Sequence, residues 1–175
     1  MKSLILIPLL FTLSGCTVLA KSATKEPHRE HSAHVHGAAT LAMAFEGPNG
    51  KVEFKTAAES VLGFEHVAKS AKDRSTFEQT KGRFESIGQY IQMDPALLCH
   101  FSVLRIEQKK ESEKENHSDF IAEYNLDCAK DPLNTKIKID FSSFPNLNDL
   151  DITILAGNIQ KNLEAKKTAV VVELK

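Results

Sequence analysis

Two strand-like segments, each with a cysteine at its outer end, constrain the fold of this chain more than any other feature. They read CHFSVLRIEQK, starting at Cys99, and SDFIAEYNLDC, ending at Cys128, and the polar stretch KESEKENH joins them. Antiparallel pairing with Cys99 opposite Cys128 places apolar residues on one face of a hairpin, because alternate strand residues share a face. The facing pairs are then Phe101 with Leu126 and Val103 with Tyr124. The apolar pattern and a disulfide therefore predict the same register.

The third cysteine ends an N-terminal segment, residues 1–15, that is typical of a signal peptide. Its apolar run, 4–13, is about ten residues long, too short to cross a bilayer of roughly 30 Å as a helix. The letters LSG before Cys16 make the segment similar to a bacterial lipobox, which implies cleavage before Cys16 and lipidation of that residue. The alternative is a plain secretory peptide that is cleaved near Ala20.

Lipidation would tether the mature chain to a membrane without embedding it. Thr17 follows the cysteine in place of the Asp that retains lipoproteins in the inner membrane, so we expect the periplasmic face of the outer membrane. Residues 16–33 then form a lipidated, flexible, histidine-containing tether, and residues 34–175 form a single β-rich domain. The net charge of -1 offers no basic field for nucleic acid.

In an oxidising compartment Cys99 and Cys128 are expected to form a disulfide. Cross-strand neighbours lie about 4.5–5.5 Å apart, a separation that disulfide geometry accepts. Closing a loop of about 30 residues should stabilise the fold by about 3–4 kcal/mol. A dithiol metal or redox site is the alternative, but the sequence contains no Cys-x-x-Cys motif.

Alternating apolar residues predict further strands along the chain. TLAMAFEG and KVEFKTA, on either side of a PNG turn, indicate a first hairpin. The segments KIKIDF, LDITIL and AVVVEL continue the alternation, whereas ESVLGFEHVAK is expected to be a loop. The predicted fold class is α+β, mainly antiparallel β, arranged as a sheet or sandwich with one amphipathic helix.

The helix is predicted over residues 73–92, where apolar residues recur at helical spacing. These residues are Phe77, Phe84, Ile87 and Ile91. Ser75 and Glu78 can form a capping box at its start. Gly82 and Gly88 cost the helix about 1 kcal/mol each, so it needs packing to be stable.

The stretch HREHSAHVHG contains His28, His31, His34 and His36, four of the seven histidines of the chain. If a strand begins at His34, the side chains of His34 and His36 project from one face about 6.5–7 Å apart and can converge on one ion at roughly 2.0–2.1 Å. His28 and His31 can join as further ligands. Imidazole suits zinc, copper and nickel alike.

A further ligand must come from the body of the domain. Glu65 and His66, in GFEH, are candidates, and so is His117 at the end of the polar hairpin loop. The alternative for a lone histidine is a hydrogen-bonded loop residue. His100 falls opposite Asp127 in the hairpin and is interpreted as an exposed pair.

Enzyme activity is not expected. The sequence has no His-Glu-x-x-His helix, no Gly-x-Ser-x-Gly elbow and no glycine-rich phosphate loop. The inferred disulfide also leaves no free thiol to act as a nucleophile.

Several motifs together resemble the zinc-regulated periplasmic zinc-binding proteins called ZrgA. They are HVHGAATLAMAFEG, LGFEHVAK, PALLC, HSDFIAEYNLDC and FPNLNDLDI, in this order, and they extend over about residues 34–154. The resemblance implies capture of Zn2+ in the periplasm and its supply to an inner-membrane importer. The matching positions are His34, His36, Glu65, His66 and His117, with Cys99 and Cys128 as the cysteine pair of the family.

Three departures from this family stand out. The hairpin loop keeps a single histidine where many similar proteins have a long His/Asp/Glu-rich insert, and Ile121 stands where histidine is frequent. Both changes remove nitrogen ligands, so the zinc capacity should be lower. The lipobox is the third departure, and it favours storage or collection of zinc near the outer membrane over delivery by diffusion.

The resulting hypothesis is a periplasmic zinc-binding lipoprotein that captures or buffers zinc and passes it to a zinc ABC importer or to its binding protein. His34 and His36 anchor the site in the zinc-binding domain, 34–175, and His66 is the body ligand. Because a bound imidazole is neutral, affinity should fall as the pH drops through about 6.5. The alternative is a structural or adaptor lipoprotein that binds a partner protein. A metallohydrolase would need an open zinc position and a substrate, which the sequence does not specify.

Overall fold

The computed structural model describes residues 36–110, 116–166 and 168–175. All of them belong to one compact unit, His31–Lys175. The strands are β1 (Ala38–Glu46), β2 (Asn49–Ala57), β3 (Ile91–Gln92), β4 (His100–Lys110), β5 (Ser118–Asp127), β6 (Lys136–Asp140), β7 (Asp149–Ala156), β8 (Ile159–Lys166) and β9 (Ala169–Glu173). The α-helices are α1 (Ala58–Leu62) and α2 (Ala71–Glu85), and short 3-10 helices lie at Ile87–Gln89 and Pro95–Leu97.

The predicted signal peptide and tether lie outside the described residues. The same is true of Cys16, of the histidines His28, His31 and His34, and of residues 111–115 in the hairpin loop. Neither helix among the described residues is long and apolar enough to span a bilayer.

Six strands form the larger sheet, in the order β4-β5-β2-β1-β7-β8. Its two predicted hairpins, β1–β2 and β4–β5, are both present and antiparallel. The sheet is mainly antiparallel, as predicted, with one parallel pair, β1 and β7, in which Leu41 lies opposite Ile152. Parallel neighbours need a long crossover, and here the segment between β2 and β7 supplies it.

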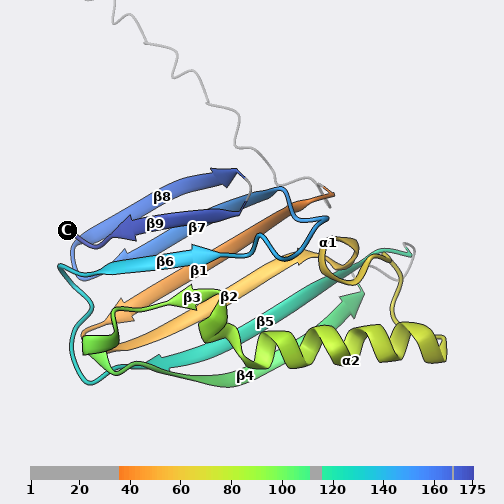
Figure 1. Ribbon diagram of the computed structural model, residues 1–175, viewed down its shortest axis with the longest axis horizontal. Coiled ribbons are helices and arrows are strands. Elements are labelled where there is room, and N and C mark those ends of the chain that lie inside the picture. Colours follow the sequence, from red (N-terminus) through yellow and green to blue (C-terminus); the bar gives the residue numbers. More distant parts are fainter. Residues whose placement is uncertain (1–35, 111–115, 167) are drawn as a thin grey trace, which may run out of the picture. The chain divides into compact units, whose positions relative to one another are not determined.

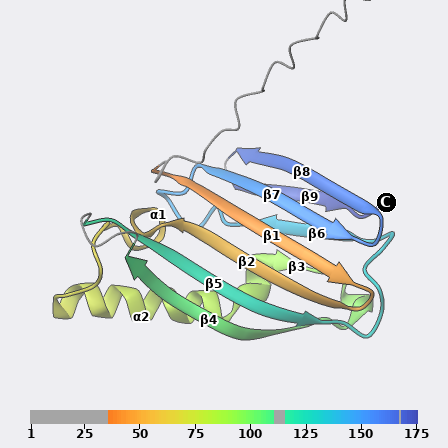
Figure 2. The ribbon, with the colours of Figure 1, turned by 180° about the vertical axis from the view of Figure 1, so that it is seen from behind.

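The smaller sheet, β3-β6-β9, packs with α2 over one face of the larger sheet. The view from behind shows the opposite face of the six-stranded sheet in front of all described elements (Figure 2). Residues alternate accordingly: Leu41, Met43 and Phe54 are buried, whereas Lys51 and Glu53 are exposed. The fold is therefore mainly β in two layers, with the core between them (Figure 1).

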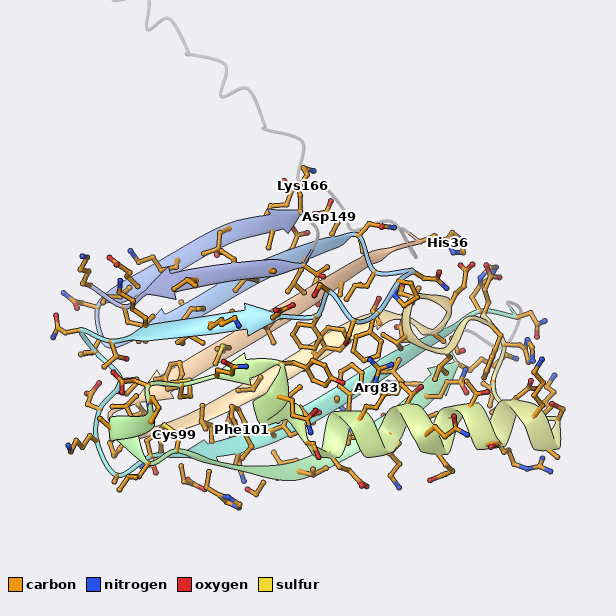
Figure 3. The ribbon with its side chains drawn as sticks, viewed as in Figure 1. His36, Arg83, Cys99, Phe101, Asp149 and Lys166 are labelled. Atoms are coloured by element: carbon orange, nitrogen blue, oxygen red, sulfur yellow. A yellow bond between two sulfur atoms is a disulfide. The ribbon has the colours of Figure 1, made fainter. Side chains whose placement is uncertain are left out.

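Aromatic rings from both layers fill the centre of this core. Phe84, from α2, lies 4.9 Å from Phe54 and 4.7 Å from Phe120, measured between ring centroids. The Tyr124 hydroxyl donates a hydrogen bond to the Phe84 carbonyl at 2.8 Å. Burial raises the pKa of this Tyr124 hydroxyl. At the rim the Arg83 guanidinium lies 3.8 Å from the centroid of the Phe144 ring (Figure 3). These contacts attach α2 to the sheet.

The predicted helix differs from α2 at both ends. The capping box is not Ser75 with Glu78: the Ser70 hydroxyl accepts a hydrogen bond from the Asp73 amide, and the Asp73 carboxylate accepts one from the Ser70 amide. The helix ends at Glu85, since the chain turns through a 3-10 helix into β3. Ile91 is buried as a strand residue opposite Ile139, not as part of a helical face.

The disulfide hairpin is confirmed in its predicted register. Cys99 and Cys128 are bonded. Phe101 pairs with Leu126 and Val103 with Tyr124, and His100 faces Asp127 with both side chains exposed. A bulge follows Val103, so that Arg105 is the next residue to pair, opposite Glu123. The predicted pairing register of the hairpin therefore holds from Phe101 to Val103.

Besides β3, the sequence does not predict α1 or β8. The segment ESVLGFEHVAK is not a loop throughout, because Ala58–Leu62 form α1, which ends at Gly63 with a φ of 77°. Strand β8, with the sequence IQKNLEAK, pairs with β7 at the edge of the larger sheet. This sequence has few apolar residues, so the apolar alternation that predicts a strand is weak.

Candidate metal centre

Gly37 lies directly before β1 and is held by three hydrogen bonds of its backbone. Its carbonyl accepts hydrogen bonds from the amides of Asn148 (2.7 Å) and Asp149 (3.0 Å), and its amide donates to the buried Ser60 hydroxyl at 3.2 Å. Its φ of +80° lies in the left-handed region, and an added Cβ would meet the Asn148 side-chain nitrogen at 2.9 Å. The left-handed φ favours glycine here, and the close approach of Asn148 adds to that preference.

Strand β1 does not include His36. Strand β1 begins at Ala38, and His36 lies in the turn before it. The turn at Gly37 is the physical reason, since the left-handed conformation interrupts an extended chain. His34 lies outside the described residues, so the proposed convergence of His34 and His36 on one ion stays a prediction.

The turn presents the His36 ring to two carboxylates. Its Nδ1 contacts Oε2 of Glu59, and its Nε2 lies 3.3 Å from Oε1 of Glu65. Ligand atoms of these three residues all lie within 4.8 Å of one another. The side chains are open to solvent, with exposed fractions of 52% for His36, 39% for Glu59 and 40% for Glu65.

His117 approaches the same group from the hairpin loop. Its Nδ1 lies 3.0 Å from Oε2 of Glu65. The two oxygens of the Glu65 carboxylate thus face two different imidazoles. Four chain segments meet at this point: the turn before β1, helix α1, the loop after α1 and the residue before β5.

His66 lies in a different place from the one predicted for a body ligand. Its Nε2 is 3.2 Å from Oδ2 of Asp73, at the start of α2, and its ring lies 5.1 Å from that of Phe64. Hydrogen bonds from the Ser70 backbone and side chain, and from His66, hold the pKa of Asp73 below its ordinary value. The structure therefore groups His36, Glu65 and His117 and leaves His66 with Asp73.

Glu59 was missed by the sequence reasoning. It lies on α1, within a segment that was expected to be a loop. A helix at 58–62 would have suggested that Glu59 is held in one orientation, but its proximity to His36 depends on the fold of the whole domain.

The chemistry of this donor set fits a transition-metal ion. Imidazole nitrogen and carboxylate oxygen are both ordinary ligands of Zn2+, bound at roughly 2.0–2.2 Å. Two ligands of a tetrahedral ion with such bonds lie about 3.4 Å apart. The observed 3.3 Å between His36 Nε2 and Glu65 Oε1 already has this length.

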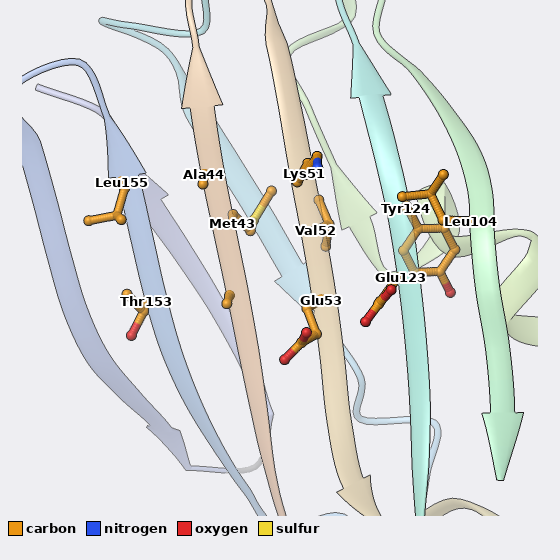
Figure 4. Close-up of a pocket in the computed structure, with 11 residues that line it drawn as sticks. Met43, Ala44, Lys51, Val52, Glu53, Leu104, Glu123, Tyr124, Thr153 and Leu155 are labelled. Carbon is orange, nitrogen blue, oxygen red and sulfur yellow. The ribbon is translucent and has the colours of Figure 1, made fainter. Parts of the chain in front are cut away.

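A hollow in the described surface lies elsewhere. A depression of about 350 Å3 lies on the open face of the larger sheet, and it includes none of the four clustered residues (Figure 4). Its lining includes Ala42, Ala44, Leu104 and Leu155. The metal candidate is thus an exposed cluster at the end of a sheet and not an enclosed pocket.

Fold and cluster together define a β-rich protein with a candidate site for a divalent transition metal. The family model described as ZrgA family zinc uptake protein matches residues 33–174, and the chain belongs to this family. This confirms the resemblance seen in the motifs and assigns the chain a role in zinc uptake. A comparison with curated proteins finds no match.

Proposed function

We propose that this protein is a periplasmic, lipid-anchored zinc-binding protein that captures or buffers Zn2+ and passes it to a zinc importer. The observation that carries the proposal is the Glu65 carboxylate between two imidazoles, with His36 Nε2 at 3.3 Å and His117 Nδ1 at 3.0 Å. No catalytic step is part of the proposal, and zinc is the cargo.

The ligands have different roles in this proposal. His36 Nε2, Glu65 and His117 bind the ion, with a side-chain movement closing His117 onto it. Glu59 accepts the hydrogen of His36 Nδ1 and orients the ring, as carboxylates do for metal-bound histidines. The fourth position is left for water or for His34, whose Cα is at most about 7 Å from that of His36 along the chain.

Exposure suits exchange of the ion better than permanent storage. Each of the four side chains is 39–52% exposed, so a partner's ligands can approach the ion directly. A buried structural zinc site would instead be closed to a fifth ligand. This accessibility supports transfer of zinc to an importer or to its binding protein.

The proposed location rests on three features of the sequence and one of the structure. The predicted signal peptide and the lipobox at Cys16 support export and anchoring, with the outer membrane favoured by Thr17. The Cys99–Cys128 disulfide is the kind of bond that persists in an oxidising compartment such as the periplasm.

Titration calorimetry of the purified protein with Zn2+ tests the site. Glu65→Gln and His36→Ala should each weaken binding at least about tenfold, equivalent to about 1.4 kcal/mol. His100→Ala, an exposed histidine on β4 outside the cluster, is the matched control and should bind as the unaltered protein does. Equal affinity in all four proteins would disprove the assignment.

A further inference from the structure

We infer that Gln108 and Ser118, on the β4–β5 hairpin, are positioning residues that hold Glu65 in the metal centre. The inference rests on the proposed function, since it assigns to these residues a role in zinc affinity. Neither residue is a ligand. Each bonds the backbone of the loop that carries Glu65.

Ser118 contacts Glu65 itself. It is the first residue of β5, with 1% of its surface exposed. Its hydroxyl donates a hydrogen bond to the Glu65 carbonyl at 2.5 Å and accepts one from Gln108 Nε2 at 2.8 Å. The preceding residue, His117, faces the Glu65 carboxylate. Consecutive residues of the hairpin therefore contact the two ends of Glu65, its side chain and its backbone.

Gln108 holds the next part of the loop. Its Nε2 donates to the His66 carbonyl at 2.7 Å, and its Oε1 accepts from the Ala68 amide at 2.9 Å. One side-chain amide thus bonds a carbonyl and an amide two residues apart, as a neighbouring strand would. The bonding joins residues that lie 40 and 42 positions apart in the chain.

The loop needs such support because it has no regular structure of its own. Residues 63–70 connect α1 to α2 without helix or strand. Fixing the backbone of a residue costs conformational entropy, and a free loop would pay this cost on binding the ion. The hydrogen bonds from Gln108 and Ser118 order Glu65 before zinc arrives, so less entropy is lost in the binding step.

A double-mutant cycle separates positioning from general stability. Gln108→Met keeps the length of the side chain and removes its amide, and Ser118→Ala removes one oxygen. Each is made in the full-length protein and again in the Glu65→Gln variant. Gln160→Met, at an exposed position on β8, is the control for Gln108→Met.

We expect Gln108→Met and Ser118→Ala each to weaken Zn2+ binding by about tenfold, the range seen when partners of metal ligands are removed. In the Glu65→Gln background the same changes should weaken binding less than about twofold, because the residue they position no longer supplies a carboxylate. With Co2+ as the probe, the visible absorption should also change in both variants, a signal that loss of stability alone does not alter. Gln160→Met should leave affinity and spectrum unchanged.

Three results would overturn the inference while leaving the proposed function intact. They are unchanged affinity in both variants, an equal loss with and without the Glu65 carboxylate, and an unaltered Co2+ spectrum. If Gln108→Met does not fold, Ser118→Ala decides, since it deletes a single atom. Absence of zinc binding by the unaltered protein would instead contradict the proposed function itself, together with the inference.

Discussion

His36 Nε2 lies 3.3 Å from Oε1 of Glu65, across the gap between the turn before β1 and the loop after α1. Neither residue belongs to a strand or a helix. Neighbouring residues hold each of them in place. Hydrogen bonds of Gly37 hold His36, and the hydrogen bond from Ser118 of the β4–β5 hairpin holds Glu65. The contact is therefore a product of the scaffold, and changes in the scaffold should alter metal binding.

Zinc should stabilise the folded protein, because the proposed ligands His36, Glu65 and His117 come from three separate segments that the folded chain brings together. At a free zinc concentration 100 times Kd the gain is about 2.7 kcal/mol, which raises Tm by roughly 5–10 °C for a domain of this size. Thermal unfolding with and without Zn2+, followed by addition of a chelator, measures this effect. An adaptor lipoprotein whose histidines bind no metal would unfold at the same temperature in all three conditions.

Gly37→Ala should weaken both folding and zinc binding. The left-handed φ of +80° disfavours alanine by about 1–2 kcal/mol, and the new Cβ would lie 2.9 Å from Asn148 Nδ2. His36 should consequently lose its fixed direction. Urea unfolding and zinc titration of the variant check the two effects separately. Gly82→Ala, at an open position on α2, is the control and should stabilise the helix by about 1 kcal/mol.

Reduction of the Cys99–Cys128 disulfide should destabilise the domain by about 3–4 kcal/mol, given a sequence separation of 29 residues. The zinc affinity of the folded protein should change little, because Cys99 lies at the far end of the sheet from His36 (Figure 3). Denaturant unfolding with and without a reductant gives the first quantity, and zinc titration under the same conditions gives the second. A large loss of zinc affinity on reduction would contradict this prediction and show that breaking the disulfide alters the other end of the hairpin.

The start of α2 should lose stability in acid through Asp73. Its pKa is lowered in the folded state from an ordinary value of 3.8, chiefly by hydrogen bonds from Ser70. A lowered pKa stabilises the fold above the unfolded-state value, and this contribution is lost as the pH falls through 3.8 toward the folded-state value. Asp73→Asn should thus be less stable than the unaltered protein at pH 7, with the difference narrowing below pH 3.8. A difference in unfolding free energy that stays constant with pH would contradict this account.

Much of the secondary structure follows from local patterns. Alternation in TLAMAFEG and KVEFKTA predicts the hairpin in which Leu41 pairs with Phe54. In the second hairpin the cysteines and the apolar residues agree on one register, and the structure has it. Both predictions succeed because a short loop joins the paired strands. In such hairpins the spacing along the chain almost determines which residues meet.

Helix α2 shows where local reasoning becomes insufficient. Apolar spacing alone extends the helix to residue 92, but pairing of Ile91 with Ile139 ends it earlier. The alternative capping residues, Ser70 and Asp73, fit the same local rule as Ser75 and Glu78. Helix α2 is attached to the sheet by packing of Phe84 against Phe54 and Phe120, which is a tertiary contact that local rules do not include.

The sequence by itself determined the β-rich class, the two hairpins, the disulfide and the resemblance to a zinc uptake family, because each depends on residues near one another or on motifs in order. Only the tertiary structure decided that β1 and β7 are parallel, that Glu59 meets His36, and that His66 pairs with Asp73. These relationships join segments whose approach depends on the packing of both layers. Spacing along the chain carries no information about how closely these segments approach one another. A metal centre built from four segments therefore forms only when the whole domain is folded.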